Sequence, residues 1–135
     1  MKYEVKVTGP VSVTLSPDEV TAVKFYSDSP DDSNARSSEL TVSATVEGKI
    51  LIDALSDVQS DQLAAWSVKD HEEESDYANV EITCTGADSS VARKVTLTSA
   101  FLASYYESFN GNSAIGKFTA VFKQVKTKNA ATAVE

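Results

Sequence analysis

Most of the chain alternates between apolar and polar residues with a period of two, which is the pattern of β-strands that bury one face. Alternation predicts six or seven strands, over 2–7, 11–16, 20–26, 40–52, 80–84, 95–109 and 117–123. Short runs of Gly, Pro, Asn, Asp and Ser separate most of them, as expected of turns. The sequence Ser16-Pro17-Asp18-Glu19 predicts one helical turn at most. We therefore expect a mainly β fold, a barrel or a sandwich of antiparallel strands.

One segment follows a helical period instead. Residues 53–68 lack strand alternation, and their apolar residues fit one broad helical face, most clearly at 60–68. Trp66 lies on this face, so we expect it to anchor the helix to the sheet. Two polar segments stand out as surface loops, 27–39 and the acidic stretch 70–76. The loop 27–39 is long for a compact domain, and such loops are often functional.

The strand predicted at 95–109 has apolar residues at both parities, with Leu102 and Tyr106 on the parity opposite to Phe101 and Tyr105. Such a strand is buried on both faces or reserves one face for a partner. No domain linker or internal repeat is visible. We expect one domain over residues 1–126, followed by a flexible tail at 127–135 that has little to pack.

The composition and net charge disfavour two classes of function. The 135 residues include 12 basic and 20 acidic side chains, for a net charge of −8. This charge disfavours general nucleic-acid binding and attachment to an anionic membrane. The imbalance is uneven, because residues 1–90 contain 18 acidic and 6 basic residues, whereas 91–135 contain 2 and 6. Two surfaces of opposite sign would attract copies head to tail, although a chance imbalance on one folded surface is equally compatible with these counts.

No catalytic constellation is recognisable. The single His71 lies in the acidic stretch, and the single Cys84 shares a strand face with apolar residues, which favours a packed cysteine over a nucleophile. The acidic stretch lacks zinc-ligand and calcium-loop spacing, so we read it as solvated surface; whether it binds a cation stays open. We expect no enzyme activity, no cofactor and no metal. The start of the chain has no apolar segment typical of a secretory signal, which predicts a cytoplasmic protein or export without a cleaved signal.

Three stretches, taken together, resemble a known family. They are 28–50, with Val46-Glu47-Gly48-Lys49-Ile50; 63–82, with Leu63-Ala64-Ala65-Trp66-Ser67; and 95–124, closing with Ile115-Gly116-Lys117-Phe118. Their order and spacing resemble Hcp-like proteins, the group related to the tube protein of type VI secretion and to phage tail tube subunits. The resemblance implies an antiparallel β-barrel of about six to seven strands with one flanking helix and one extended loop.

The resemblance also implies a structural role in a bacterial contractile apparatus. Copies of the chain would assemble into a ring, usually of six, with tube or baseplate proteins as further partners. The loop 27–39 matches the extended loop that joins neighbours. We expect the subunit contact to include Asp31, Asp32, Asn34, Arg36, Leu102 and Tyr106. Two alternatives stay open: a β-sandwich that binds a glycan or a protein, and a small enzyme with a deep pocket.

Overall fold

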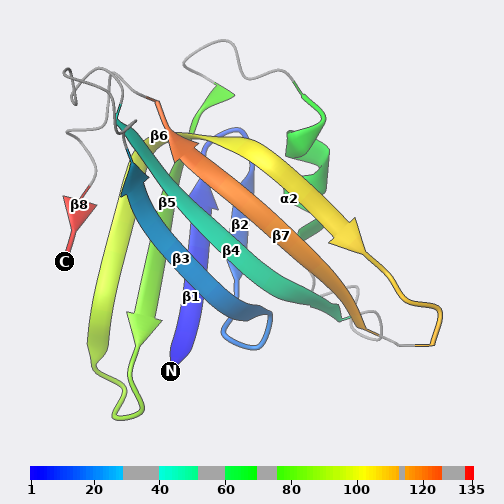
Figure 1. The fold of residues 1–135 in the computed structure, drawn as a ribbon, viewed down its shortest axis with the longest axis horizontal. Coiled ribbons are helices and arrows are strands. Elements are labelled where there is room, and N and C mark those ends of the chain that lie inside the picture. Colours follow the sequence, from blue (N-terminus) through cyan, green and yellow to red (C-terminus); the bar gives the residue numbers. More distant parts are fainter. Residues whose placement is uncertain (29–39, 52–59, 70–75, 113–114, 126–132) are drawn as a thin grey trace.

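The computed structural model describes residues 1–28, 40–51, 60–69, 76–112, 115–125 and 133–135. Within them the chain forms one antiparallel sheet and one helix (Figure 1). The strands are β1 (Lys2–Thr8), β2 (Ser12–Leu15), β3 (Val20–Asp28), β4 (Thr41–Leu51), β5 (Ala78–Thr85), β6 (Val91–Ser108), β7 (Ile115–Gln124) and β8 (Ala133–Val134), and the helix is α2 (Ser60–Ser67). The prediction of a mainly β fold with a flanking helix is confirmed.

The strands lie in the order β2-β1-β5-β6-β7-β4-β3, and β8 pairs with β6 outside this path. The sheet curls around its buried face, so that β1 comes into contact with β3 (Figure 1). No described pairing joins β2 to β3, the two ends of the order, and the barrel is therefore open. The core lies on the concave side, where Val5, Val46, Leu97 and Phe122 are each fully buried or nearly so.

Two β-bulges explain why β6 is apolar at both parities. One extra residue of β6 stands between the pairs Leu97 with Val80 and Ala100 with Ala78, and a second stands between Leu102 and Ser104 opposite β7. Each extra residue moves the following side chains to the other face of the strand. Consequently Leu97, Ala100, Leu102 and Tyr105 all face the core. The alternation had placed Leu102 and Tyr105 on opposite faces.

Gln124 braces the first bulge. Its side chain is 3% exposed, and its Oε1 accepts a hydrogen bond from the Ser99 backbone N–H at 3.2 Å. The Nε2 group donates to Thr98 Oγ1, also at 3.2 Å. The backbone N–H of Val125 donates to the Ser99 carbonyl. Because these bonds satisfy groups that the bulge removes from the strand ladder, they hold β6 in its bent course.

The corner between β2 and β3 is a single turn, as the sequence predicts. The Ser16 N–H donates to Glu19 Oε2 at 2.8 Å, and the Glu19 carbonyl accepts from Lys49 N at 2.7 Å. Gly48 lies directly beneath this corner, where a Cβ atom would come within 2.4 Å of the Glu19 carbonyl oxygen and 2.5 Å of the Phe118 ring. A side chain at position 48 would therefore separate β3 from β4.

Helix α2 covers one end of the concave face, where it packs against β6 and β2. Leu63 and Trp66 point into the core and are 0% and 1% exposed. Residues 52–59, the first part of the predicted helix, lie outside the described residues. The helix contacts the distal half of β6 through Tyr105, whose hydroxyl lies 3.5 Å from the Ser60 carbonyl oxygen.

The end of the expected tail is paired rather than free. Val134 lies opposite Val95 of β6, and backbone hydrogen bonds join Glu135 and Lys94 in both directions at 2.8 and 3.0 Å. Strand β7 reaches only as far as Ala100 along this edge of β6, so backbone groups nearer the start of β6 are open to another strand. Strand β8 takes this place, whereas the sequence, which offers the tail little to pack, predicted no strand there.

Candidate functional site

Strands β3, β4, β7 and the distal half of β6 form a four-stranded unit with a free edge on each side. Strand β3 is the last in the sheet order, and its outer edge pairs with no described strand. On the other side, pairing of β6 with β5 ends at Ala100, so among the described strands residues 101–108 of β6 pair with β7 alone. An unpaired strand edge presents a row of N–H and C=O groups that can bond to a further strand. The unit can therefore be extended at both sides.

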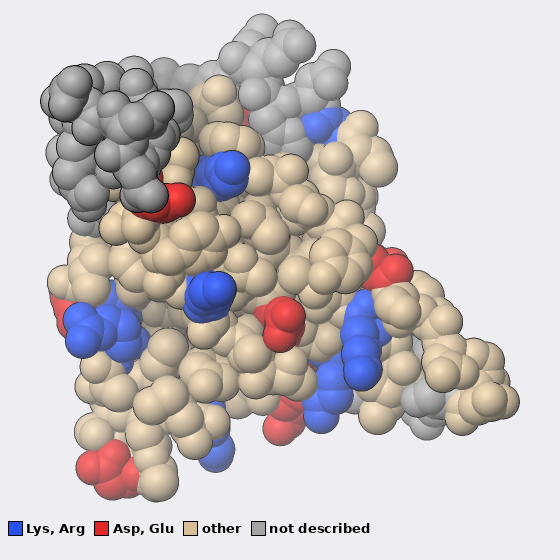
Figure 2. Space-filling view, viewed as in Figure 1, with Lys and Arg blue, Asp and Glu red and all other residues tan. Residues whose placement is uncertain are grey.

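The outer face of this unit is polar and mixed in charge. Figure 2 shows this face with lysine and acidic side chains scattered among uncharged residues. Lys24 lies over the Tyr26 ring at 5.7 Å, and Lys49 stands opposite Lys117 on neighbouring strands. The described part of the chain places no carboxylate within ion-pair distance of Lys49 or Lys117. Such a face suits contact with water or with a polar surface.

The structure places the six residues expected at the subunit contact differently. Tyr106 lies on the outer face and is 58% exposed. Leu102 is 7% exposed and belongs to the core, because the bulges turn it inward, so its side chain is not available to a neighbour. The remaining four, Asp31, Asp32, Asn34 and Arg36, lie outside the described residues.

The sequence pattern did not identify two exposed apolar residues near the β6–β7 turn. Phe109 is 58% exposed and Ile115 is 42% exposed. Phe109 stands next to the Asn110-Gly111-Asn112 turn. Its place beside the turn indicated that it would be exposed, because a hairpin tip projects from the body of its sheet.

Cys84 is partly buried beside Arg93, its cross-strand partner on β6. Burial raises the pKa of the Cys84 thiol, and the positive charge of Arg93 offsets part of this increase. A thiol with a raised pKa holds little thiolate near neutral pH, and the thiolate is the nucleophile. Its environment therefore makes Cys84 a weak nucleophile.

Tyr105 is a further side chain whose pKa is altered. Its pKa is raised, first by burial and then by the hydrogen bond and negative charge of Glu107, with a smaller contribution from Asp61. The hydroxyl donates to Glu107 Oε1 at 2.5 Å, and the ring stacks on Phe118 with centroids 6.3 Å apart. Tyr105 therefore fixes the distal half of β6 against the core and α2.

The described surface offers little that resembles a catalytic pocket. One shallow hollow of about 460 Å³ lies over β4 and β7, lined by Thr21, Glu47, Gly48, Lys49, Lys117, Phe118 and Thr119. Glu47 is the one carboxylate in this lining, whereas hydrolysis of a glycosidic bond needs two. Among the described residues no group of three or more His, Cys, Asp or Glu side chains is placed to hold a metal ion. The described helix is too short to cross a membrane.

Comparison with known proteins gives matches at the level of structure. No family model and no curated protein matches the sequence. The fold is similar to that of Hcp1 from Flavobacterium johnsoniae, with a TM-score of 0.63 and 17% identity over 92% of this chain and 90% of the other. It is also similar to a chain of an extracellular contractile injection system, the PVC sheath–tube complex in its extended state (TM-score 0.51, 12% identity, 99% of this chain, 88% of the other). A chain of the anti-feeding prophage baseplate, described as 6-fold symmetrised, matches with a TM-score of 0.50 and 12% identity over 99% and 92%. The chain therefore has the fold of Hcp-like tube proteins, as its sequence predicted.

Proposed function

We propose that this protein is a structural subunit whose copies assemble into rings, and through them a tube, in a phage-tail-like or type VI secretion-like apparatus. The observation that supports this most directly is the four-stranded unit with two different free edges. The fold is shared with proteins whose descriptions name a tube and a baseplate of contractile systems. The proposal assigns the chain no catalytic step.

Two different free edges on opposite sides of one unit favour a head-to-tail contact. The β3 edge of one copy would meet the distal β6 edge of the next, and backbone hydrogen bonds would continue the sheet across the contact. When each copy is rotated by a constant angle, such a contact closes into a ring. We propose six copies, the number implied by the sequence resemblance and by the symmetry named for the baseplate.

Residues 27–39 extend this proposal. Ser27 and Asp28 belong to β3 rather than to the predicted loop, and the rest of the segment follows directly on this strand, whose outer edge we assign to the contact. Asp31, Asp32, Asn34 and Arg36 would add polar contacts to the neighbouring copy, since carboxylate and guanidinium groups form charge-assisted bonds. Arg36→Ala should weaken assembly and leave the melting temperature of the subunit unchanged.

Partners and location follow from the proposed role. The chain would contact further copies of itself and other tube or baseplate components. It would be made in the cytoplasm and leave it, if at all, as part of the apparatus rather than by a cleaved signal.

Hydrogen exchange tests which edges take part. Amide exchange would be measured by mass spectrometry in a dilute sample and in an assembled one. The proposal predicts that peptides from β3 and from residues 101–108 of β6 gain protection together, while peptides from β5 remain unchanged. Protection confined to β1, β2 or β5 would contradict the assignment of the contact.

A further inference from the structure

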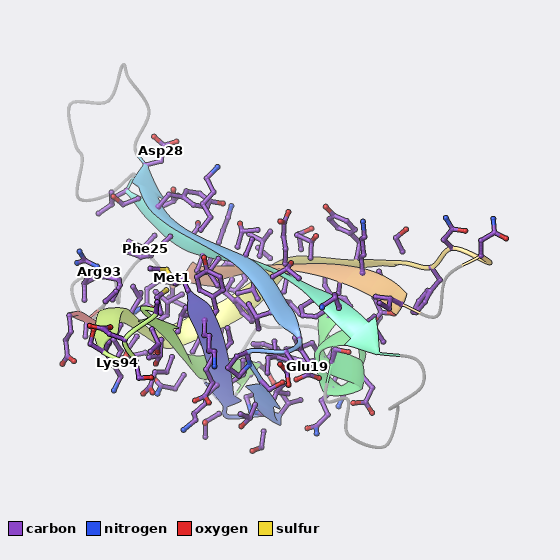
Figure 3. All side chains as sticks on the ribbon, turned by 90° about the horizontal axis from the view of Figure 1, so that it is seen from below. Met1, Glu19, Phe25, Asp28, Arg93 and Lys94 are labelled. Carbon is purple, nitrogen blue, oxygen red and sulfur yellow. The ribbon has the colours of Figure 1, made fainter. Side chains whose placement is uncertain are left out.

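The turn that follows β6 contains an Asn-Gly pair, Asn110-Gly111, to which the proposed function gives no role. In Figures 1 and 3 the hairpin of β6 and β7 forms the right-hand extremity of the molecule. Asn110 and Gly111 are both exposed and belong to no strand. Exposed loop tips are the part of a protein most open to reactions of the chain itself. The pair is therefore a place to look for such a reaction.

The backbone nitrogen of Gly111 is accessible as a nucleophile. Among the described residues, no group accepts a hydrogen bond from the Gly111 N–H. A Cβ atom at position 111 would meet no atom within 4 Å, so the space around this residue is open. Glycine also gives the backbone the rotational freedom that closure of a small ring requires.

The carboxamide of Asn110 is the matching electrophile. Its Oδ1 accepts a hydrogen bond from the Asn112 N–H at 3.0 Å. If the nitrogen of the next residue attacks the carboxamide carbon, negative charge develops on this oxygen. A donor that is already directed at the oxygen stabilises that charge, as backbone N–H groups do in an oxyanion hole. The turn thus places an open nucleophile beside a polarised electrophile.

Asn79 has an exposed carboxamide without this neighbourhood. It lies in β5 opposite Thr8 of β1, and the next residue is Val80, which is 0% exposed. The branched side chain of a valine is stiff and crowds its own backbone nitrogen. Asn79 therefore has the electrophile but lacks the open nucleophile.

We propose that Asn110 is a site of spontaneous deamidation. The Gly111 nitrogen loses its proton to solvent base and forms a bond to Cγ of Asn110. The bond from Cγ to the amide nitrogen breaks, ammonia leaves, and a cyclic succinimide remains. Water then adds to a ring carbonyl. Cleavage of the newly formed bond gives aspartate in a normal chain, whereas cleavage of the original peptide bond gives isoaspartate, in which the chain continues through the side chain.

Both products alter this end of the subunit. Each adds a negative charge to a chain whose net charge is already −8. The new carboxylate lies two residues beyond Ser108, which pairs with Lys117 at the end of the hairpin. Isoaspartate also lengthens the main chain by a carbon atom, so the hydrogen bond from the Asn112 N–H loses its geometry. Deamidation would therefore change the charge and the order of the hairpin as the protein ages.

The test is incubation of the whole chain from mildly acidic to mildly alkaline pH, followed by peptide mapping with mass spectrometry. Fragmentation of the peptides distinguishes aspartate from isoaspartate. Gly111→Ala is the matched variant, because the backbone of Gly111 is not in the left-handed region and the added methyl group meets no neighbour. Asn79 is a control within the same sample.

The inference predicts that Asn110 deamidates while Asn79 does not, and that both aspartate and isoaspartate form. The rate should rise with pH, because the attacking nitrogen must lose its proton. Gly111→Ala should slow the reaction by about tenfold, since each tenfold in rate reflects a modest change in the barrier. Equal rates at Asn110 and Asn79, or a rate that Gly111→Ala leaves unchanged, would overturn the inference. Aspartate formed without isoaspartate would indicate direct hydrolysis of the carboxamide and would also overturn it.

Discussion

Trp66 and Val68 are two residues apart, yet one is 1% exposed and the other 85%. Trp66 is on the inner face of α2, whereas Val68 follows the end of the helix. Burial of the largest side chain in the core stabilises the fold, while an exposed valine contributes almost nothing. The pair therefore separates a residue that holds the subunit together from one that does not.

Trp66→Ala should lower the free energy of unfolding by roughly 3–5 kcal/mol, the usual cost of truncating a buried aromatic residue. Val68→Ala should change it by less than about 0.5 kcal/mol, as is usual for exposed positions. Urea unfolding followed by circular dichroism measures both. A loss below about 1 kcal/mol for Trp66→Ala would show that the helix is not anchored by this side chain.

Cys84 offers a test of the local electrostatics. Replacing Arg93 by glutamine removes the charge that lowers the Cys84 pKa, so the pKa should rise further above its ordinary value. Less thiolate is then present at any pH below that pKa, and alkylation by iodoacetamide should slow down. The midpoint of the rate against pH should move upward in Arg93→Gln. A midpoint shared with the unaltered protein would contradict the role given to Arg93.

Strand β6 is the element in which the prediction from the sequence and the structure differ most. Hydrophobic periodicity is a local signal; a period of two was sufficient for strands such as β1 and β4, and a helical period was sufficient for the position of α2. The bulges of β6 depend on pairing with β5 on one side and β7 on the other, and each of these partners is bonded along only part of β6. For this reason Leu102, which alternation assigns to the same face as Tyr106, packs in the core, whereas Tyr106 is exposed.

The hydrogen bonds of Gln124 should stabilise the first bulge of β6. Gln124→Met keeps most of the side-chain volume but leaves the Ser99 N–H and the Thr98 hydroxyl without their bonds to the amide. The expected cost is about 1 kcal/mol of stability, because a partly buried donor loses its acceptor. Exchange of the Ser99 amide should accelerate at the same time. The control is Lys123→Met on the outer face; equal stability of the two variants would refute the bracing role.

At the scale of the whole molecule, the open barrel determines what the protein can do. A closed barrel has no free edges, whereas this sheet leaves one edge of β3 and one edge of the distal half of β6 unpaired among the described residues. Natural proteins usually protect such edges, because they invite unintended pairing. Edges left open at opposite sides of one unit are instead suited to pairing with further copies of the same chain.

The most direct test of self-assembly is the mass and symmetry of the protein in solution. Light scattering would be recorded from dilute to millimolar concentration, with electron microscopy of the most concentrated sample. We expect a discrete multiple of the subunit mass of 14.4 kDa and ring-shaped particles with rotational symmetry. A mass of one subunit at every concentration, with no rings, would contradict the proposed function and favour a monomeric binding module.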